Sequence, residues 1–240
     1  MANYSSYFIN INRLLMWKKL PGGEEYLAQE NIKCLPLEKQ GELFRDWIEE
    51  NCKNTRNLDL SEVGLTYLPP EICQLSKLQG LYLNQNQLTN LPVEIGQLPK
   101  LQRLELNQNQ LTALPAEISQ LSQLQVLYLN QNQLTNLPVE ISQLSQLQEL
   151  RLNQNQLTNL PVEIGQLSQL KWLLDLSQNE LTALPAEIGQ LSRLRRLYLN
   201  QNQLTGLPVE IGQLSQLTSL ELAENPLKDI AEKIRQRFQL

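Results

Sequence analysis

Residues 124–146 read LQVLYLNQNQLTNLPVEISQLSQ, and close copies of this 23-residue unit fill most of the chain. The second asparagine of the NQN motif recurs at positions 86, 109, 132, 155, 179, 202 and 225, so the steps are 23 residues except for one of 24. An earlier unit carries Val63 in that place, which makes eight units from residue 55 to residue 228, the last truncated. Self-similarity at this period is typical of a solenoid, in which each unit packs against its neighbours.

Each constant position of the unit has a structural explanation. Leu127 and Leu129 alternate with the period of a strand that buries one face, and stacking such strands predicts one parallel sheet. Asn132 follows the strand, where its amide can bond buried backbone groups of its own coil and the next. Pro138 suits a first helical position, and Glu140 lies two residues later. The second half of the unit is therefore predicted to form a short helical or 3-10 turn.

Residues 1–54 and 229–240 lack the repeat and are predicted to cap the two ends. An open solenoid exposes an apolar cross-section that has to be covered. Apolar residues at helical spacing predict the cap helices: Phe8, Ile11 and Leu15; then Phe44, Trp47, Ile48 and Cys52; and finally Ile230, Ile234 and Phe238. Trp47 is interpreted as a residue of the cap core rather than a binding anchor.

Composition argues against several classes of protein. The net charge is −5, whereas nucleic-acid-binding proteins concentrate Lys and Arg on one face. The absence of histidine removes the commonest general base and most zinc sites. We therefore expect no catalysis, cofactor, metal, nucleic acid or membrane contact, and a monomer when unbound. Cys34, Cys52 and Cys73 show no regular spacing, so either free thiols or one disulfide remains open.

The repeat resembles the leucine-rich-repeat superfamily, in the 23-residue version of bacterial and intracellular proteins. The resemblance covers residues 55 to about 230. It implies an α/β solenoid, a horseshoe with a concave parallel β-sheet, a helical N-terminal cap and a short C-terminal capping helix. In most members the concave side binds the ligand.

Residues 44–72, FRDWIEENCKNTRNLDLSEVGLTYLPPEI, are similar to the start of the repeats in bacterial effectors that act inside host cells. Some of those effectors carry a ubiquitin-ligase domain with a nucleophilic cysteine, but no cysteine follows Cys73, so the resemblance implies no such activity here. The first twenty residues contain no apolar segment typical of a signal peptide. The expected location is the cytoplasm, or a host cell reached by a non-Sec route.

Comparison of the units with one another predicts the binding residues, because positions that vary and face away from the core are free for function. Two such columns mix tyrosine, arginine, acidic and small residues, and Tyr and Arg are enriched at interface hot spots. The predicted partner-binding residues are Tyr82, Arg103, Glu105, Val126, Tyr128, Glu149, Arg151, Trp172, Leu173, Asp175, Arg196, Tyr198 and Glu221. The alternative is that variation on this face is neutral.

The sixth unit contains the one additional residue of the array, in the sequence LKWLLDL at residues 170–176. Keeping Leu174 and Leu176 in the core leaves an extra residue at 171–173, which predicts a bulge in the strand. One interpretation pushes Trp172 and Leu173 onto the concave side, near Arg151, Asp175 and Arg196. The other folds Leu173 inward and lays Trp172 over the edge of a coil.

These patterns favour a non-catalytic module that recognises another protein through its concave face, in a bacterial effector or regulator. The alternative is recognition of a carbohydrate or lipid headgroup by the tyrosines. In an enzyme, Glu105, Glu149 and Asp175 could supply paired catalytic carboxylates, but a shallow open sheet offers them no closed cleft.

Overall fold

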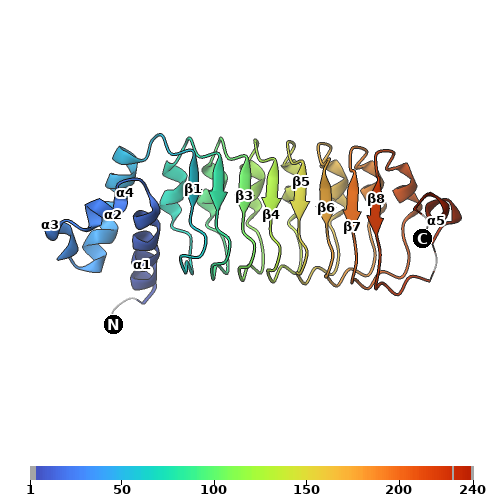
Figure 1. Ribbon diagram of the computed structural model, residues 1–240, viewed down its shortest axis with the longest axis horizontal. Coiled ribbons are helices and arrows are strands. Elements are labelled where there is room, and N and C mark those ends of the chain that lie inside the picture. The colour runs from blue at the N-terminus through green and yellow to red at the C-terminus, as the bar shows by residue number, and fades with distance from the viewer. Residues whose placement is uncertain (1–3, 229, 239–240) are drawn as a thin grey trace.

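The computed structural model describes residues 4–228 and 230–238 and shows a coil of stacked turns (Figure 1). Strands run along one side, and their neighbours are parallel in the order β1 to β8. The strands are β1 Asn57–Asp59, β2 Gly80–Tyr82, β3 Arg103–Glu105, β4 Val126–Tyr128, β5 Glu149–Arg151, β6 Leu173–Asp175, β7 Arg196–Tyr198 and β8 Ser219–Glu221. Leu104 pairs with Leu127, 23 positions later, so one sequence unit makes one turn of the coil. The predicted solenoid is confirmed.

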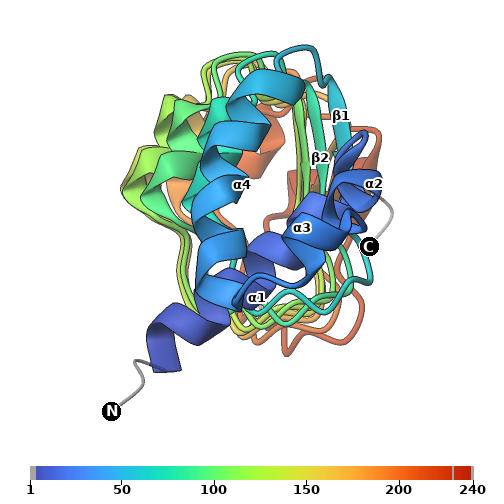
Figure 2. The same ribbon diagram turned by 90° about the vertical axis from the view of Figure 1, so that its left-hand side faces the viewer.

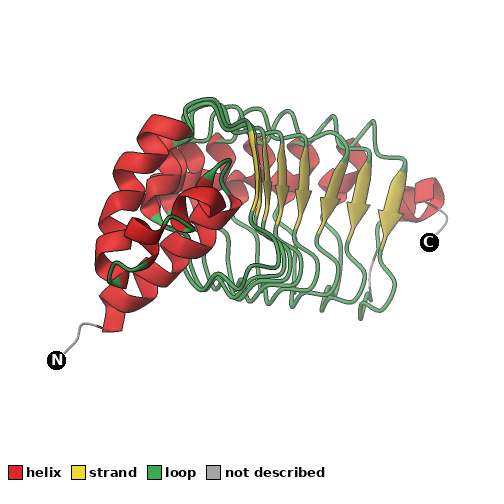
Figure 3. Cartoon of the chain, turned by 60° about the vertical axis from the view of Figure 1, so that its left-hand side comes forward, coloured by secondary structure: helices red, strands yellow, loops and turns green. Residues whose placement is uncertain are grey.

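The opposite side of the coil is formed by 3-10 turns, which Figure 3 shows facing away from the strands. These turns are η1 Pro70–Gln74, η2 Val93–Gln97, η3 Ala116–Gln120, η4 Val139–Gln143, η5 Val162–Gln166, η6 Ala186–Gln190 and η7 Val209–Gln213. The turn was predicted correctly, but its proline was misplaced: Pro138 is the residue before η4, with φ −64° and ψ 145°. Its fixed φ suits the approach to the turn, while its extended ψ keeps it outside.

The core lies between the strands and the 3-10 turns. Leu127, Leu129 and Ile141 of the fourth unit are fully buried, as are their equivalents in most other units. Burial of each such side chain contributes roughly 1.5–3 kcal/mol. Because a single coil would expose both of its flat sides, this apolar surface becomes buried only when coils stack.

The recurring asparagine forms the predicted ladder through the core. The Asn132 amide nitrogen donates to the carbonyls of Leu106 and Leu129 at 2.9 and 3.0 Å, and its oxygen accepts the Leu111 N–H at 3.0 Å. Asn132 is only 7% exposed. Its amide therefore satisfies backbone groups that the turn leaves without ladder partners.

Four helices cover the N-terminal end of the coil, as the view along the axis shows (Figure 2). They are α1 Tyr4–Lys19, α2 Gly23–Leu27, α3 Glu30–Lys33 and α4 Leu37–Asn51. The α4 stripe is confirmed, because Phe44, Trp47, Ile48 and Cys52 are all buried. The α1 stripe is only partly correct: Leu15 packs against the core and Ile11 is half-buried, but Phe8 is 53% exposed, whereas Met16 and Trp17 are fully buried. Trp17 stacks among Tyr26, Phe44 and Trp47, so the aromatic cluster, rather than Phe8, sets the inward face of α1.

Polar contacts join α1 to the first coil. Asn12 is 1% exposed, and its amide oxygen accepts the N–H groups of Thr66 and Tyr67 at 3.0 and 3.2 Å. Arg13 lies 2.6 Å from Glu71, a carboxylate that is only 3% exposed. These bonds supply partners to a coil that has no preceding coil to provide them.

Helix α5, Glu232–Phe238, lies at the other end of the coil (Figure 1). Ile234 is 1% exposed, while Ile230 and Phe238 are half-buried. Arg237 donates to the carbonyls of Leu214 and Leu217 at 2.7 and 3.2 Å, so α5 bonds the backbone of the last coil. The predicted cap also included residues 229, 239 and 240, which lie outside the described residues.

The three cysteines differ in exposure and are all free thiols: Cys34 is exposed, Cys73 half-buried and Cys52 buried. Burial raises the pKa of the Cys52 and Cys73 thiols. Among the described helices, none combines the length and apolar character that crossing a bilayer requires.

Candidate functional site: the outward face of the sheet

The first and third residues of each strand point away from the core, and we call this surface the sheet face. Its members are Asn57, Asp59, Gly80, Tyr82, Arg103, Glu105, Val126, Tyr128, Glu149, Arg151, Leu173, Asp175, Arg196, Tyr198, Ser219 and Glu221. The middle residue of every strand is a buried leucine, such as Leu127. Every predicted partner-binding residue except Trp172 therefore lies on the sheet face.

Exposure divides the predicted residues into three groups. Those that are half-buried are Tyr82, Arg103, Glu105, Val126, Tyr128, Glu149, Arg151, Asp175 and Tyr198. Trp172, Arg196 and Glu221 are exposed, whereas Leu173 is buried. The half-buried residues keep part of their surface open while their neighbours fix their positions.

Tyr128 lies at the centre of the sheet face between two arginines. The guanidinium carbons of Arg103 and Arg151 lie 4.9 and 4.6 Å from the centre of its ring. Because these arginines come from β3 and β5, on either side of β4, both lie against the ring from neighbouring strands. Cation–π contacts of this kind hold a tyrosine in one orientation.

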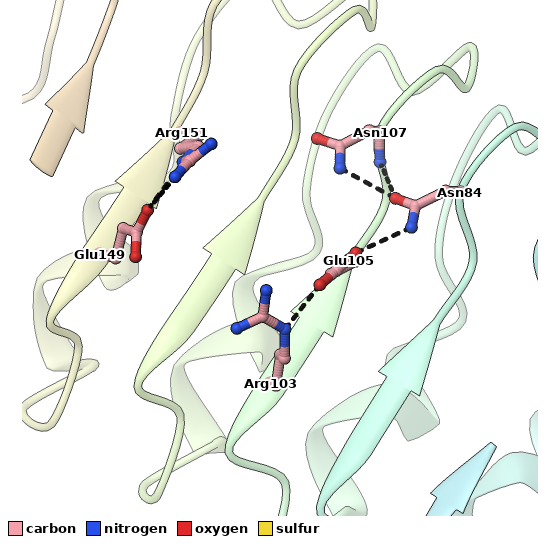
Figure 4. A network of polar contacts seen from close by, with 6 residues as sticks. All are labelled: Asn84, Arg103, Glu105, Asn107, Glu149 and Arg151. Atoms are coloured by element: carbon pink, nitrogen blue, oxygen red, sulfur yellow. Dashed lines mark hydrogen bonds and ion pairs between the residues drawn. The ribbon is translucent and has the colours of Figure 1, made fainter. Parts of the chain in front are cut away.

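Each of these arginines is neutralised by a glutamate on its own strand (Figure 4). Arg103 Nε lies 2.6 Å from Glu105, and Arg151 Nη2 lies 2.6 Å from Glu149. Glu105 and Glu149 are 14% and 16% exposed, so solvent screens the pairs only in part. The centre of the sheet face is thus aromatic and polar, with little net charge.

Asparagines at the ends of the strands extend this network (Figure 4). Asn84 donates to Glu105 at 2.9 Å, and its oxygen accepts the backbone N–H and side-chain amide of Asn107 at 3.0 and 2.9 Å. Asn107 in turn accepts the N–H of Asn130 at 3.0 Å. This second ladder was missed by the sequence analysis, although the constancy of the position was its signal.

Burial changes the pKa of two acidic groups on the sheet face, the Tyr128 hydroxyl and the Asp175 carboxyl. Burial raises the pKa of the Tyr128 hydroxyl further above neutral pH, where a tyrosine hydroxyl is protonated and can donate a hydrogen bond. Burial also raises the pKa of Asp175, although its carboxylate accepts the N–H of Ser177 at 3.1 Å. Glu221, at the edge of the sheet, accepts a bond from Asn200 at 2.7 Å.

The extra residue of the sixth unit forms a bulge where β6 begins. Leu173 is in register with Glu149 of β5, but the pairing of β6 with β7 begins only at Leu174 and Leu197. Leu173 is 7% exposed, so the expectation that it offers surface to a partner is wrong. A bulge places two residues opposite one, and here Trp172 takes the open position while Leu173 is covered.

Trp172 is 45% exposed. The residues around its ring differ from those expected if it lay on the concave side near Arg151, Asp175 and Arg196. Its ring lies 4.5 Å from Lys171 Nζ and 5.1 Å from Arg195 Cζ, at the edge where the strands begin. Among the described residues, the cation–π partners of Trp172 are thus Lys171 and Arg195 rather than Arg151 or Arg196. Lys171 and Arg195 were not among the predicted binding residues, although both interrupt a column that is otherwise mostly glutamine.

Within the described residues, no group of three or more His, Cys, Asp or Glu side chains is placed to hold a metal ion. Glu105 and Glu149, considered above as candidates for paired acids, lie on β3 and β5 with β4 between them. Each is held by its own arginine, Arg103 or Arg151. The arrangement can present an ordered aromatic and polar surface to a partner.

Comparison with known families matches residues 53–111 and 99–157 to the leucine-rich repeat, and residues 146–238 to the leucine-rich repeat region. A search of curated proteins gave no match. Among solved structures, the chain is similar to a leucine-rich-repeat protein of Leptospira interrogans at 47% identity and a TM-score of 0.75, covering 78% of this chain and 47% of that one.

Two further structures extend the comparison. The ectodomain of the Arabidopsis thaliana receptor kinase GASSHO1/SCHENGEN3, solved in complex with CASPARIAN STRIP INTEGRITY FACTOR 2, is 41% identical with a TM-score of 0.66, covering 71% of this chain and 21% of that one. Internalin C2 of Listeria monocytogenes is 25% identical with a TM-score of 0.66, covering 78% of each chain. The chain thus spans about half the length of the Leptospira protein and about a fifth of the plant ectodomain.

Proposed function

Because this chain belongs to the leucine-rich-repeat family, we propose that it is a non-catalytic module that recognises a partner protein through the sheet face. The observation that carries this proposal is the arrangement of Arg103, Tyr128 and Arg151. Tyrosine and arginine dominate interface hot spots, and side chains already held in one orientation lose little entropy on binding. The plant ectodomain of the same fold was solved with a bound factor, which supports a protein or peptide ligand.

At Tyr128, the same geometry disfavours the carbohydrate alternative. A sugar ring stacks on the open face of an aromatic side chain, but both neighbouring strands place a guanidinium against Tyr128. What the tyrosine offers a ligand is its edge and its protonated hydroxyl. A protein surface with backbone carbonyls and apolar side chains suits such an anchor.

We further propose that residues 1–54 and 229–240 act as caps, and that the module works as a monomer until it binds. We also propose that it acts as a bacterial effector or regulator, in the cytoplasm or in a host cell; its similarity to proteins of Leptospira and Listeria supports the bacterial part of this proposal.

The test uses two pairs of substitutions on opposite sides of the coil. Tyr128→Ala with Trp172→Ala removes aromatic surface from the strand side, and Val139→Ala with Val162→Ala removes exposed apolar surface from the 3-10 turns. Partners captured by the wild-type chain are identified by mass spectrometry, purified, and titrated against all three proteins. We expect the first pair to weaken binding by at least about 2 kcal/mol with an unchanged melting temperature, and the second to leave affinity as it is. Equal affinities for all three proteins would refute the sheet-face site.

A further inference from the structure

A cluster of cations lies at the edge of the sheet where β6 and β7 begin, and we call it the basic edge. It consists of Lys171, Arg193 and Arg195, grouped with Trp172. The Arg195 N–H donates to the Lys171 carbonyl at 2.9 Å, so the two cations come from adjacent coils. The Trp172 ring lies within about 5 Å of both. Lys171, Arg193 and Arg195 also line a shallow hollow, with Ser192, Ser215 and Gln216.

The basic edge differs from the centre of the sheet face because its charges are not neutralised. Arg103 and Arg151 are each paired with a glutamate, but none of Lys171, Arg193 and Arg195 forms an ion pair with any residue that the structure describes. Arg193 donates instead to the neutral amide of Gln169. The chain as a whole carries a charge of −5, so this local positive potential opposes its overall field.

Comparison among the coils shows that the fold does not require these cations. The positions equivalent to Lys171 and Arg195 are glutamine in four other coils, at 79, 102, 125 and 148. The backbone of Gln79 nevertheless accepts the N–H of Gln102 at 2.8 Å, as Lys171 accepts that of Arg195. Likewise, the position of Arg193 is occupied by Gln123, Gln146 and Gln169 in other coils.

We propose that the basic edge binds an extended, Asp- and Glu-rich segment of the partner protein. Carboxylates pair with guanidinium groups through two parallel hydrogen bonds, and the serines and Gln216 of the hollow can donate further ones. Trp172 covers the aliphatic parts of such a segment. Three cations favour a short acidic peptide over a nucleic acid, because a long polyanion would also meet the negative field of the rest of the chain. This inference rests on the proposed function, since it specifies the chemistry of one part of the partner.

The experiment is a calorimetric titration of the full chain with an octaglutamate peptide at about 50 mM salt, where screening of exposed charges is weak. The test variant is R193Q/R195Q, which introduces the glutamine found in other coils. The matched control is K77Q/K100Q, which removes two cations from the row of loops that contains Arg193 and lowers the net charge equally. We expect saturable binding that the test variant weakens at least fivefold and the control leaves within twofold.

Absent binding, or an equal loss in both variants, would overturn the proposal, because the attraction would then be missing or would depend on net charge alone. Tighter binding of a single-stranded oligonucleotide or of phosphatidylserine vesicles than of octaglutamate would also overturn it. None of these variants alters Tyr128, so partner capture that still depends on Tyr128 would show that only the basic-edge inference had failed.

Discussion

Replacing Asn132 with alanine removes one rung of the buried asparagine ladder. In the wild-type chain, Asn132 accepts the N–H of Leu111 and donates to the carbonyls of Leu106 and Leu129. The two carbonyls each keep a second donor, from the ladder asparagines Asn109 and Asn155. Among the described residues, the Leu111 N–H has no other acceptor, so it becomes a buried, unsatisfied donor.

The expected loss of stability in N132A follows from the hydrogen bonds that the substitution removes. An unsatisfied buried donor costs about 1–3 kcal/mol, and each carbonyl loses one of its two bonds at a smaller cost. We expect N132A to lower the free energy of unfolding by about 3 kcal/mol. Asn225 makes the same three bonds to Leu199, Leu204 and Leu222 in the last coil, but it is only half-buried and water can replace its amide. N225A should therefore cost about 1 kcal/mol or less.

Urea denaturation followed by circular dichroism measures both variants against the wild type. Both the midpoint of the urea transition and its slope, the m-value, have to be compared. A weakened internal coil can let the two halves of a repeat protein unfold separately, which would lower the m-value. Equal destabilisation by N132A and N225A, or a cost below 1 kcal/mol for N132A, would refute the view that burial of the ladder sets its contribution.

Two further predictions concern the half-buried carboxylate of Asp175 and the buried carboxylate of Glu71. Burial raises the pKa of Asp175, so its contribution to stability is fully present below the unfolded pKa and is lost as the pH rises through the folded one. The amide oxygen of D175N can still accept the Ser177 N–H. We expect D175N to have a higher melting temperature than the wild type at pH 7 and the same melting temperature below about pH 4. An equal gain at both pH values would contradict this explanation. Glu71 is 3% exposed and lies 2.6 Å from Arg13, so E71A leaves a partly buried guanidinium without its partner. The free energy of unfolding of E71A, measured in urea, should fall by about 3 kcal/mol. The control is E140A, because Glu140 is the half-buried equivalent of Glu71 in the turn η4, and its loss should change the free energy of unfolding by less than about 0.5 kcal/mol. Similar costs for the two variants would show that the ion pair does not hold α1 against the first coil.

The fold could be predicted from the sequence because each of its determinants repeats. Leu127 recurs in all eight units, and Asn132 and Ile141 recur in seven of them, so each of these residue types reports the same environment many times. The register of the sheet follows from the period alone, as the pairing of Leu104 with Leu127 shows. The caps do not repeat, and there the prediction was weaker: Phe8 was assigned to the core, although Trp17 and Asn12 hold that place.

The sequence was enough to predict which residues lie on the sheet face, but not which side chains contact one another there. The strand period fixes which residues point outward, so Tyr128 and Arg151 were located correctly. Whether an outward residue is covered depends on its neighbours on adjacent strands, which is why Leu173 is buried. The additional residue of the sixth unit indicated a bulge, but only packing decides which of two residues takes the open position.

Arginines that are ion-paired, at the centre of the sheet face, and arginines without an ion-pair partner among the described residues, at the basic edge, should contribute to binding in different ways. Arg103 and Arg151 are neutralised and hold Tyr128, so a partner meeting the centre of the sheet face gains from contact area and shape rather than from net charge. Arg193 and Arg195 are exposed at the edge and form no ion pair with the described residues, so they can steer the approach of a partner, although screening by solvent keeps their contribution to equilibrium affinity small. Substitutions at the edge should therefore act mainly on the association rate and its dependence on salt, and substitutions at the centre on the dissociation rate. Kinetics in which R193Q/R195Q alters only the dissociation rate would argue that the edge is part of the close-packed contact.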